Sequence, residues 1–147
     1  MKFDYVEINS QIARPLIIVK ISFEQKFLVT EALIDSGSDY CIFPIEAAQA
    51  LHIPIKKAKM THVTGFLEGK AKLFLFPIKL AIGKYSIEIV AGFAQGMGRY
   101  APCTLGQKGF FDNFKVCFDK SRSQIEINPK KSKTSKSQPI WQQIGSL

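Results

Sequence analysis

The chain has 147 residues, of which 46% are hydrophobic and 22% are charged. This length and balance predict one globular domain and exclude a wholly disordered chain. No apolar run approaches the ~20 residues that cross a bilayer, and Asp4 and Glu7 interrupt the stretch where a signal peptide would be apolar. Three scattered cysteines without C-x-x-C spacing suit reduced thiols better than a disulfide framework or a zinc site. We therefore expect a soluble cytoplasmic protein with no metal and no cofactor.

The excess of positive charge lies mostly at the C-terminal end. The formal net charge is +8, and the segment from residue 120 onward carries +5 of it. Residues 130–137 follow Pro129 and contain no apolar side chain, which is typical of a solvated linker. We predict a folded domain over residues 1–128 and a basic linker and tail over residues 129–147. Within the tail, Trp141 either docks as part of a short helix or belongs to a frayed end.

Two kinds of partner are not expected. No aromatic residues interleave with the lysines of the tail, so a solvated tail is favoured over a nucleic-acid-binding one. The lack of a long apolar run argues against a membrane partner.

Short β-favouring runs separated by turn residues predict a mostly β fold, with no helical period longer than about two turns. In chain order we expect a strand within residues 1–8, a hairpin of residues 15–23 and 26–34, and a strand at 40–43. Pro44 then opens a helix over residues 45–51. The next expected elements are a hairpin of 57–63 and 70–82 with its tip at 64–69, and a turn at Gly83-Lys84 into a strand at 85–93. A short buried strand at 103–105, a short helix over 106–114 and a hairpin of 115–119 and 123–128 complete the expected fold.

The residues around Asp35 suit a carboxylate fixed at the end of a strand. Apolar Ala32-Leu33-Ile34 leads to Asp35, and Ser36-Gly37 allows the backbone to turn sharply beneath it. An ordinary strand that ends in an Asx turn would use the same residues, so this motif alone leaves a structural and a catalytic interpretation open. Ser36 is a weak candidate nucleophile because the Gly-x-Ser-x-Gly elbow lacks its first and last glycines.

A second segment, Cys103-Thr104-Leu105-Gly106 followed by Gly109-Phe110-Phe111-Asp112-Asn113-Phe114, lies some 70 residues downstream. Together with Leu33-Ile34-Asp35-Ser36-Gly37 it resembles the retropepsin-like aspartic proteases, in their bacterial branch. The resemblance implies an all-β fold, a closed β-barrel lobe with one or two short helices. It also implies a catalytic Asp35, active-site support from Ser36, Gly37, Leu105 and Gly106, and a substrate-binding and flap set of Asp39, Thr64, Gly65, Phe66, Leu67 and Gly69.

The family chemistry needs two carboxylates. Peptide hydrolysis without a metal or a covalent nucleophile requires one group to take a proton from water and another to donate one to the carbonyl oxygen. Two adjacent aspartates that share one proton meet this need. The chain has one Asp-Ser-Gly and is too short for two lobes of ~100 residues each, whereas a two-fold axis presents the same residue twice. We therefore expect a homodimeric endopeptidase acting on peptide or protein substrates. The alternative is a catalytically silent dimerisation or peptide-binding module of the same fold.

Two positions depart from the family pattern. Where retroviral relatives have an arginine that pairs with an acid resembling Asp39, this chain has Gln107 and Lys108. The expected flap tip carries only two glycines and a charged Glu68. These departures leave the ion pair, the flap mobility and the substrate preference unassigned.

Other chemically capable residues have structural explanations. His52 and His62 lack neighbours at the spacing of a ligand set, so we expect surface or half-buried structural histidines. The three cysteines, Cys41, Cys103 and Cys117, lie in apolar strands and are expected to be buried thiols. Four phenylalanines, Phe110, Phe111, Phe114 and Phe118, have the spacing of a core-packing helix and strand.

Overall fold

Two long hairpins form most of the sheet in the computed structural model, which describes residues 1–64, 70–98 and 101–131. The first joins β4 (Leu16–Phe23) to β5 (Lys26–Ile34), and the second joins β8 (Lys70–Ile82) to β9 (Tyr85–Ala94). In β4 the side chains alternate between buried and exposed, as expected of a strand with one face on a core. Gly83 makes the second turn with a φ of 54°, a conformation that glycine adopts without strain. Both hairpins confirm the sequence prediction.

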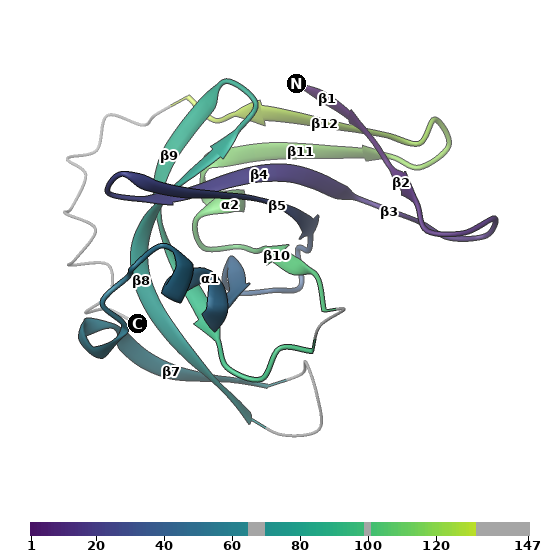
Figure 1. The fold of residues 1–147 in the computed structure, drawn as a ribbon. Coiled ribbons are helices and arrows are strands. Elements are labelled where there is room, and N and C mark those ends of the chain that lie inside the picture. Colours follow the sequence, from purple (N-terminus) through teal and green to yellow (C-terminus); the bar gives the residue numbers. More distant parts are fainter. Residues whose placement is uncertain (65–69, 99–100, 132–147) are drawn as a thin grey trace.

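Six strands close into a barrel (Figure 1). Their order is β4-β5-β10-β6-β9-β8, where β10 is Cys103–Leu105 and β6 is Ile42–Pro44, and β8 pairs back onto β4. An additional strand, β7 (Lys59–Thr64), pairs with β8 outside this closed ring and forms the last strand of the sheet. The closed barrel leaves few sheet edges among the described residues, and β7 carries one of them.

A second, three-stranded sheet lies beside the barrel (Figure 1) and has the order β1-β12-β11. It consists of β1 (Lys2–Asp4), β12 (Gln124–Pro129) and β11 (Phe114–Asp119). The amino group of Met1 donates a hydrogen bond to the carbonyl oxygen of Ile127 at 2.8 Å. A small hairpin of β2 (Val6–Glu7) and β3 (Ala13–Arg14) projects from the same side as the β11–β12 turn. The final hairpin was predicted from the sequence, but these other pairings were not.

The helices are short, as predicted. They are α1 (Ile45–Ala50), a 3-10 turn η1 (Ile55–Lys57) and α2 (Phe110–Asn113). The predicted helix within residues 106–114 is therefore shorter than expected. The N–H groups of Gln107 and Lys108 instead donate hydrogen bonds to main-chain oxygens of the segment after Asp35, so these two residues do not join the helix.

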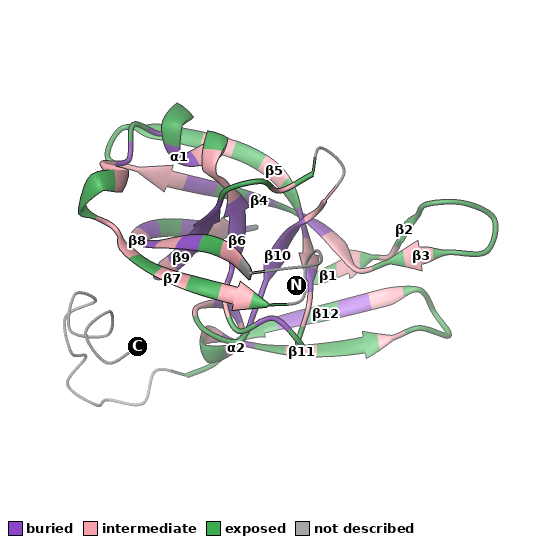
Figure 2. Ribbon diagram, turned by 90° about the horizontal axis from the view of Figure 1, so that it is seen from below, coloured by how far each residue is buried: buried purple, intermediate pink, exposed green. Residues whose placement is uncertain are grey.

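The core fills the barrel and the space under the three-stranded sheet (Figure 2). Its largest fully buried side chains include Phe43, Phe93, Phe110 and Phe114. Burial of one such side chain stabilises the fold by about 1.5–3 kcal/mol. Hydrophobic burial therefore holds the elements that position the site described below.

Two expectations about β11 are wrong. Cys117 is exposed, whereas Cys41 and Cys103 are buried as expected. Phe118 is 42% exposed, whereas Phe110 and Phe114 are in the core. β11 is an edge strand with one face on the core, so alternation turns Cys117 outward, and Phe118 lies beyond the well-covered part of the strand.

The structure describes the chain as far as residue 131. Most of the predicted tail of residues 129–147 therefore lies outside the described residues, and Trp141 is in this part. No helix in the described part is long and apolar enough to cross a membrane.

Candidate active site

A parallel pair of strands positions Asp35. β10 runs alongside β5 with Cys103 opposite Ala32, Thr104 opposite Leu33 and Leu105 opposite Ile34. The main-chain N–H of Asp35 then donates a hydrogen bond to the carbonyl oxygen of Leu105 at 3.0 Å. The pairing ends there, so Asp35 is the first residue of the turn that follows β5.

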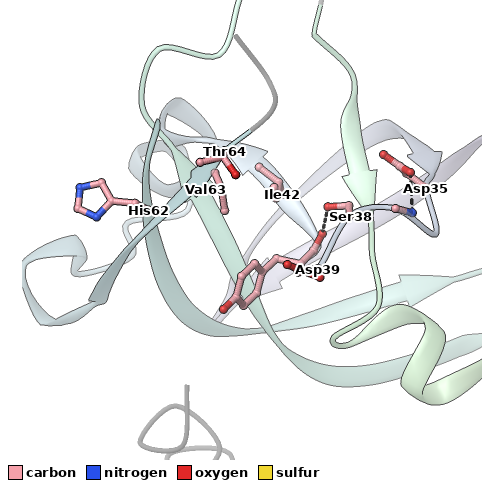
Figure 3. A pocket seen from close by; sticks show the side chains of 9 residues that line it. Asp35, Ser38, Asp39, Ile42, His62, Val63 and Thr64 are labelled. Atoms are coloured by element: carbon pink, nitrogen blue, oxygen red, sulfur yellow. Dashed lines mark hydrogen bonds between the residues drawn. The ribbon is translucent and has the colours of Figure 1, made fainter. Parts of the chain in front are cut away.

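The turn after β5 is held by short-range hydrogen bonds. The N–H of Gly37 donates to Oδ1 of Asp35 at 3.0 Å, and the N–H of Ser38 donates to the main-chain oxygen of Asp35 at 3.2 Å. The hydroxyl of Ser38 donates to the carbonyl oxygen of Tyr40 at 2.8 Å (Figure 3). A Cβ on residue 37 would lie 3.3 Å from Oδ1 of Asp35, so glycine leaves room beside the carboxylate. The Asx turn is thus present, and it fixes the direction of a carboxylate.

The segment after β10 packs directly under this turn. The N–H of Gln107 donates to the carbonyl oxygen of Ser38 at 2.8 Å, and the N–H of Lys108 donates to that of Asp39 at 2.9 Å. A Cβ on Gly106 would lie 2.3 Å from the carbonyl oxygen of Tyr40 and 2.5 Å from that of Ser38. Only glycine fits there, because both obstacles are backbone atoms.

A pocket of about 460 Å³ extends from this turn to strand β7. In Figure 3, Asp35 lies at one end, and Val63 and Thr64 of β7 lie across from it. The lining residues are Asp35, Gly37, Ser38, Asp39, Tyr40, Ile42, His62, Val63 and Thr64. β7, the strand that leads into the expected flap tip at residues 64–69, therefore faces the turn that carries Asp35.

The predicted site residues fall into three groups. Asp35, Gly37, Asp39 and Thr64 line the pocket, and Ser36 is exposed on the same turn. Leu105 and Gly106 are buried beneath the turn. The remaining flap residues, Gly65, Phe66, Leu67 and Gly69, lie outside the described residues.

Five lining residues were not assigned to the site from the sequence: Ser38, Tyr40, Ile42, His62 and Val63. The first three follow the Asp-Ser-Gly turn directly, so their position along the chain was the available signal. His62 is exposed, in line with the expected surface histidine, and its imidazole points away from Asp35 in Figure 3. His62 and Val63 reach the pocket through the pairing of β7 with β8, which brings them opposite Lys72 and Ala71.

Charged and polar side chains next to the pocket make contacts with the turn that carries Asp35. Asp35 is half-buried and Asp39 is exposed. The side chain of Gln107 donates to the carbonyl oxygen of Ser36 at 2.7 Å, and the Lys108 ammonium lies 5.1 Å from the centre of the Tyr40 ring. Gln107 and Lys108 therefore make a neutral hydrogen bond and a cation–π contact.

Burial changes the acidity of two thiols near the site. Desolvation raises the pKa of Cys41 to about 11. Desolvation also raises the pKa of Cys103, against a hydrogen bond with Thr30 that lowers it. Both thiols are thus protonated at neutral pH and unsuited to nucleophilic attack. Within the described residues, no group of three or more His, Cys, Asp or Glu side chains could hold a metal ion.

Comparison with known proteins bears on the fold. No family model matches the chain, and no curated protein matches it in sequence. Among solved structures, a retropepsin-like aspartic protease from Rickettsia conorii is similar over 85% of this chain and 88% of its own, with 17% identity and a TM-score of 0.56. EIAV protease complexed with the inhibitor HBY-793 is similar over 69% of this chain and 88% of its own, with 20% identity and a TM-score of 0.47.

Proposed function

We propose that this chain, which has the fold of the retropepsin-like aspartic proteases, is an aspartic endopeptidase that works as a homodimer. The observation that carries the proposal is the position of Asp35. Its carboxylate is fixed by the Gly37 N–H at the end of the β5–β10 pair, and it opens onto the pocket that β7 lines. The predicted all-β barrel with short helices is confirmed, so the proposal starts from an established fold.

The chemistry requires a second carboxylate beside the first. One ionised aspartate takes a proton from water, and a protonated neighbour donates one to the scissile carbonyl oxygen. Two carboxylates a few Å apart share a proton because both cannot ionise together. A two-fold axis next to Asp35 would supply the second group from an identical chain. Ser36 and Gly37 are exposed on the same turn and are available for contact with a second copy.

The substrate that suits the pocket is an extended peptide. β7 is the last strand of the sheet, and a peptide can add to such an edge through main-chain hydrogen bonds. Apolar contacts from Ile42 and Val63 and the exposed carboxylate of Asp39 line the same pocket. We propose that Asp39, Thr64 and the flap residues bind the peptide, and that residues 1–128 form the catalytic domain with 129–147 as its tail.

Replacement of the proposed catalytic group tests the function. Asp35→Asn keeps the side-chain shape and an oxygen that accepts the Gly37 N–H, but it removes the ionisable group. We expect wild-type protein to cleave members of a broad peptide library between about pH 4 and pH 7, and the variant to lose roughly 10²–10⁴-fold of that rate. Circular dichroism and sedimentation should be unchanged. Asp4→Asn, an exposed change on β1, serves as the matched control and should retain full turnover.

The oligomeric state gives a second, independent measurement. Because each chain carries one Asp-Ser-Gly motif, turnover per chain should fall on dilution as dimers dissociate, in step with the sedimentation coefficient. A strictly monomeric wild type with full turnover would contradict the proposal. Peptide binding without turnover in wild type would support the silent binding module instead.

A further inference from the structure

The side chain of Gln107 contacts the turn that carries Asp35. Its amide nitrogen donates a hydrogen bond to the carbonyl oxygen of Ser36 at 2.7 Å, across a separation of 71 residues in sequence. A carbonyl oxygen only accepts hydrogen bonds, so the nitrogen of the Gln107 amide must face it. The contact is direct and short.

The carbonyl of Ser36 belongs to the same planar peptide group as the N–H of Gly37. That N–H donates to Oδ1 of Asp35 at 3.0 Å. A single rigid plane therefore receives a hydrogen bond from Gln107 at its oxygen and gives one to Asp35 from its nitrogen. A donor at the oxygen fixes the rotation of the plane and polarises it, which strengthens the N–H as a donor.

We propose that Gln107 is a positioning residue that orients the carboxylate of Asp35 through the Ser36–Gly37 peptide. The relay runs from the amide of Gln107, through one peptide plane, to Oδ1 of Asp35. Its effect on catalysis rests on the proposed function, whereas its effect on the Gly37 N–H does not.

The side chain of Gln107 can be replaced without removing the contacts that hold the surrounding main chain. The main chain of residues 106–108 is already held by the bonds from Gln107 N–H to Ser38 and from Lys108 N–H to Asp39, and by the close packing of Gly106. These contacts do not involve the Gln107 side chain, which is exposed. Loss of the amide should thus loosen the peptide plane without unpacking the segment.

Three substitutions isolate the donor. Gln107→Met keeps the length of the side chain without a donor, and Gln107→Glu places acceptor oxygens against the Ser36 carbonyl. Gln107→Lys restores a donor on a flexible chain. Gln49→Met is the matched control, because Gln49 is exposed on α1, outside both the turn and the segment that packs beneath it.

Two readouts are measured on the full chain. The first is the solvent-exchange rate and proton chemical shift of the Gly37 amide by NMR. We expect Gln107→Met and Gln107→Glu to raise the exchange rate roughly three- to tenfold, the range that one hydrogen bond supports. The second is steady-state kinetics, where kcat should fall by a similar factor with KM nearly unchanged. Gln107→Lys should restore most of both values, and Gln49→Met should change neither.

The outcomes separate the two proposals. A Gly37 amide that is unchanged in both Gln107→Met and Gln107→Glu would overturn the positioning role, even in an active enzyme. A changed amide in a protein without turnover would keep the positioning role and reject the protease. The proposal would also be overturned if all three Gln107 variants lost the same free energy of unfolding in urea and lysine restored neither readout. Gln107 would then have a structural role only.

Discussion

The N–H of Asp35 donates a hydrogen bond to the carbonyl oxygen of Leu105 at 3.0 Å, so the candidate catalytic residue is tied to a strand far along the chain. This bond continues the parallel pairing of β5 and β10 by one residue. Beyond it, main-chain hydrogen bonds from Gln107 and Lys108 to the oxygens of Ser38 and Asp39 join the turn of residues 35–39 to the segment after β10. The rigidity of the turn that carries Asp35 therefore depends on the contact between these two segments.

Gly106→Ala should strongly destabilise this contact. The added Cβ would meet the backbone oxygens of Tyr40 and Ser38 at 2.3 and 2.5 Å, which no side-chain rotation relieves. We expect the free energy of unfolding to fall by about 2–4 kcal/mol in urea denaturation. Gly98→Ala is the matched control, since nothing lies within 4 Å of its Cβ position. Equal midpoints for the two variants would show that the packing under the turn is looser than described.

Cys41 should make stability fall at alkaline pH. Its thiol is fully buried, and desolvation raises its pKa from 9.0 to about 11 in the folded state. The unfolded chain ionises first, so the contribution of the thiol is complete below about pH 9 and is lost as the pH rises toward 11. The full loss is about 3 kcal/mol at 1.36 kcal/mol per pKa unit.

Urea unfolding of wild type and Cys41→Ala at about pH 8 and about pH 10.5 measures this effect. Other groups titrate in both proteins, so the difference in stability between them isolates the thiol. Wild type should exceed the variant at the lower pH, and the gap should narrow at the higher one. A difference in the free energy of unfolding that does not change with pH would contradict a raised pKa of the buried Cys41 thiol.

Thr104→Val should leave the protein as stable or more stable. The Thr104 hydroxyl is buried and has no hydrogen-bond partner in the described part of the chain. Valine has nearly the same shape, so the change removes an unsatisfied polar group and leaves no cavity, with a gain of up to about 1–2 kcal/mol. Thr30→Val is the comparison, because the Thr30 hydroxyl has a partner in Cys103 Sγ at 3.8 Å. A clear loss in urea midpoint for Thr104→Val would mean that the hydroxyl is satisfied in solution.

Asp39→Asn should weaken peptide binding more than catalysis. The carboxylate is exposed at the pocket wall, and Gln107 faces Ser36 instead of Asp39. We expect KM to rise roughly fivefold or more, as for the loss of one hydrogen bond to a charged group, with kcat nearly constant. Because the side chain is exposed, the urea midpoint should stay within the error of measurement. A fall in kcat alone would place Asp39 with the reacting groups.

Local patterns predicted much of the fold. The β-favouring runs within residues 15–34, the Gly83 turn and the helix start at Pro44 each depend on neighbouring residues, and each is found in the structure. The closeness of Asp35 and Gly106 came from the family resemblance, because no local pattern relates segments so far apart. The pairing of β1 with β12 also joins segments that are far apart in the sequence, and for this reason it was not predicted.

The details that were not predicted concern the direction of side chains at sheet edges and in turns. Cys117 lies in an apolar run, but the edge position of β11 decides which of its faces is covered. The contact of Gln107 with Ser36 depends on a rotamer and on backbone packing around Gly106, which composition does not encode. An arginine at that position would favour a charged partner, whereas glutamine suits a carbonyl oxygen.

The parallel pairing of β5 with β10 also has a consequence for the order of folding. Asp35 leaves the ribosome well before Leu105, and its turn gains its support only when the later strand docks. Closing so long a loop costs conformational entropy, so contacts of this kind form late. A nascent chain that has exposed only its first hairpins therefore carries the aspartate without a working site, which would keep a protease silent until the strand that contains Leu105 has been made and has docked.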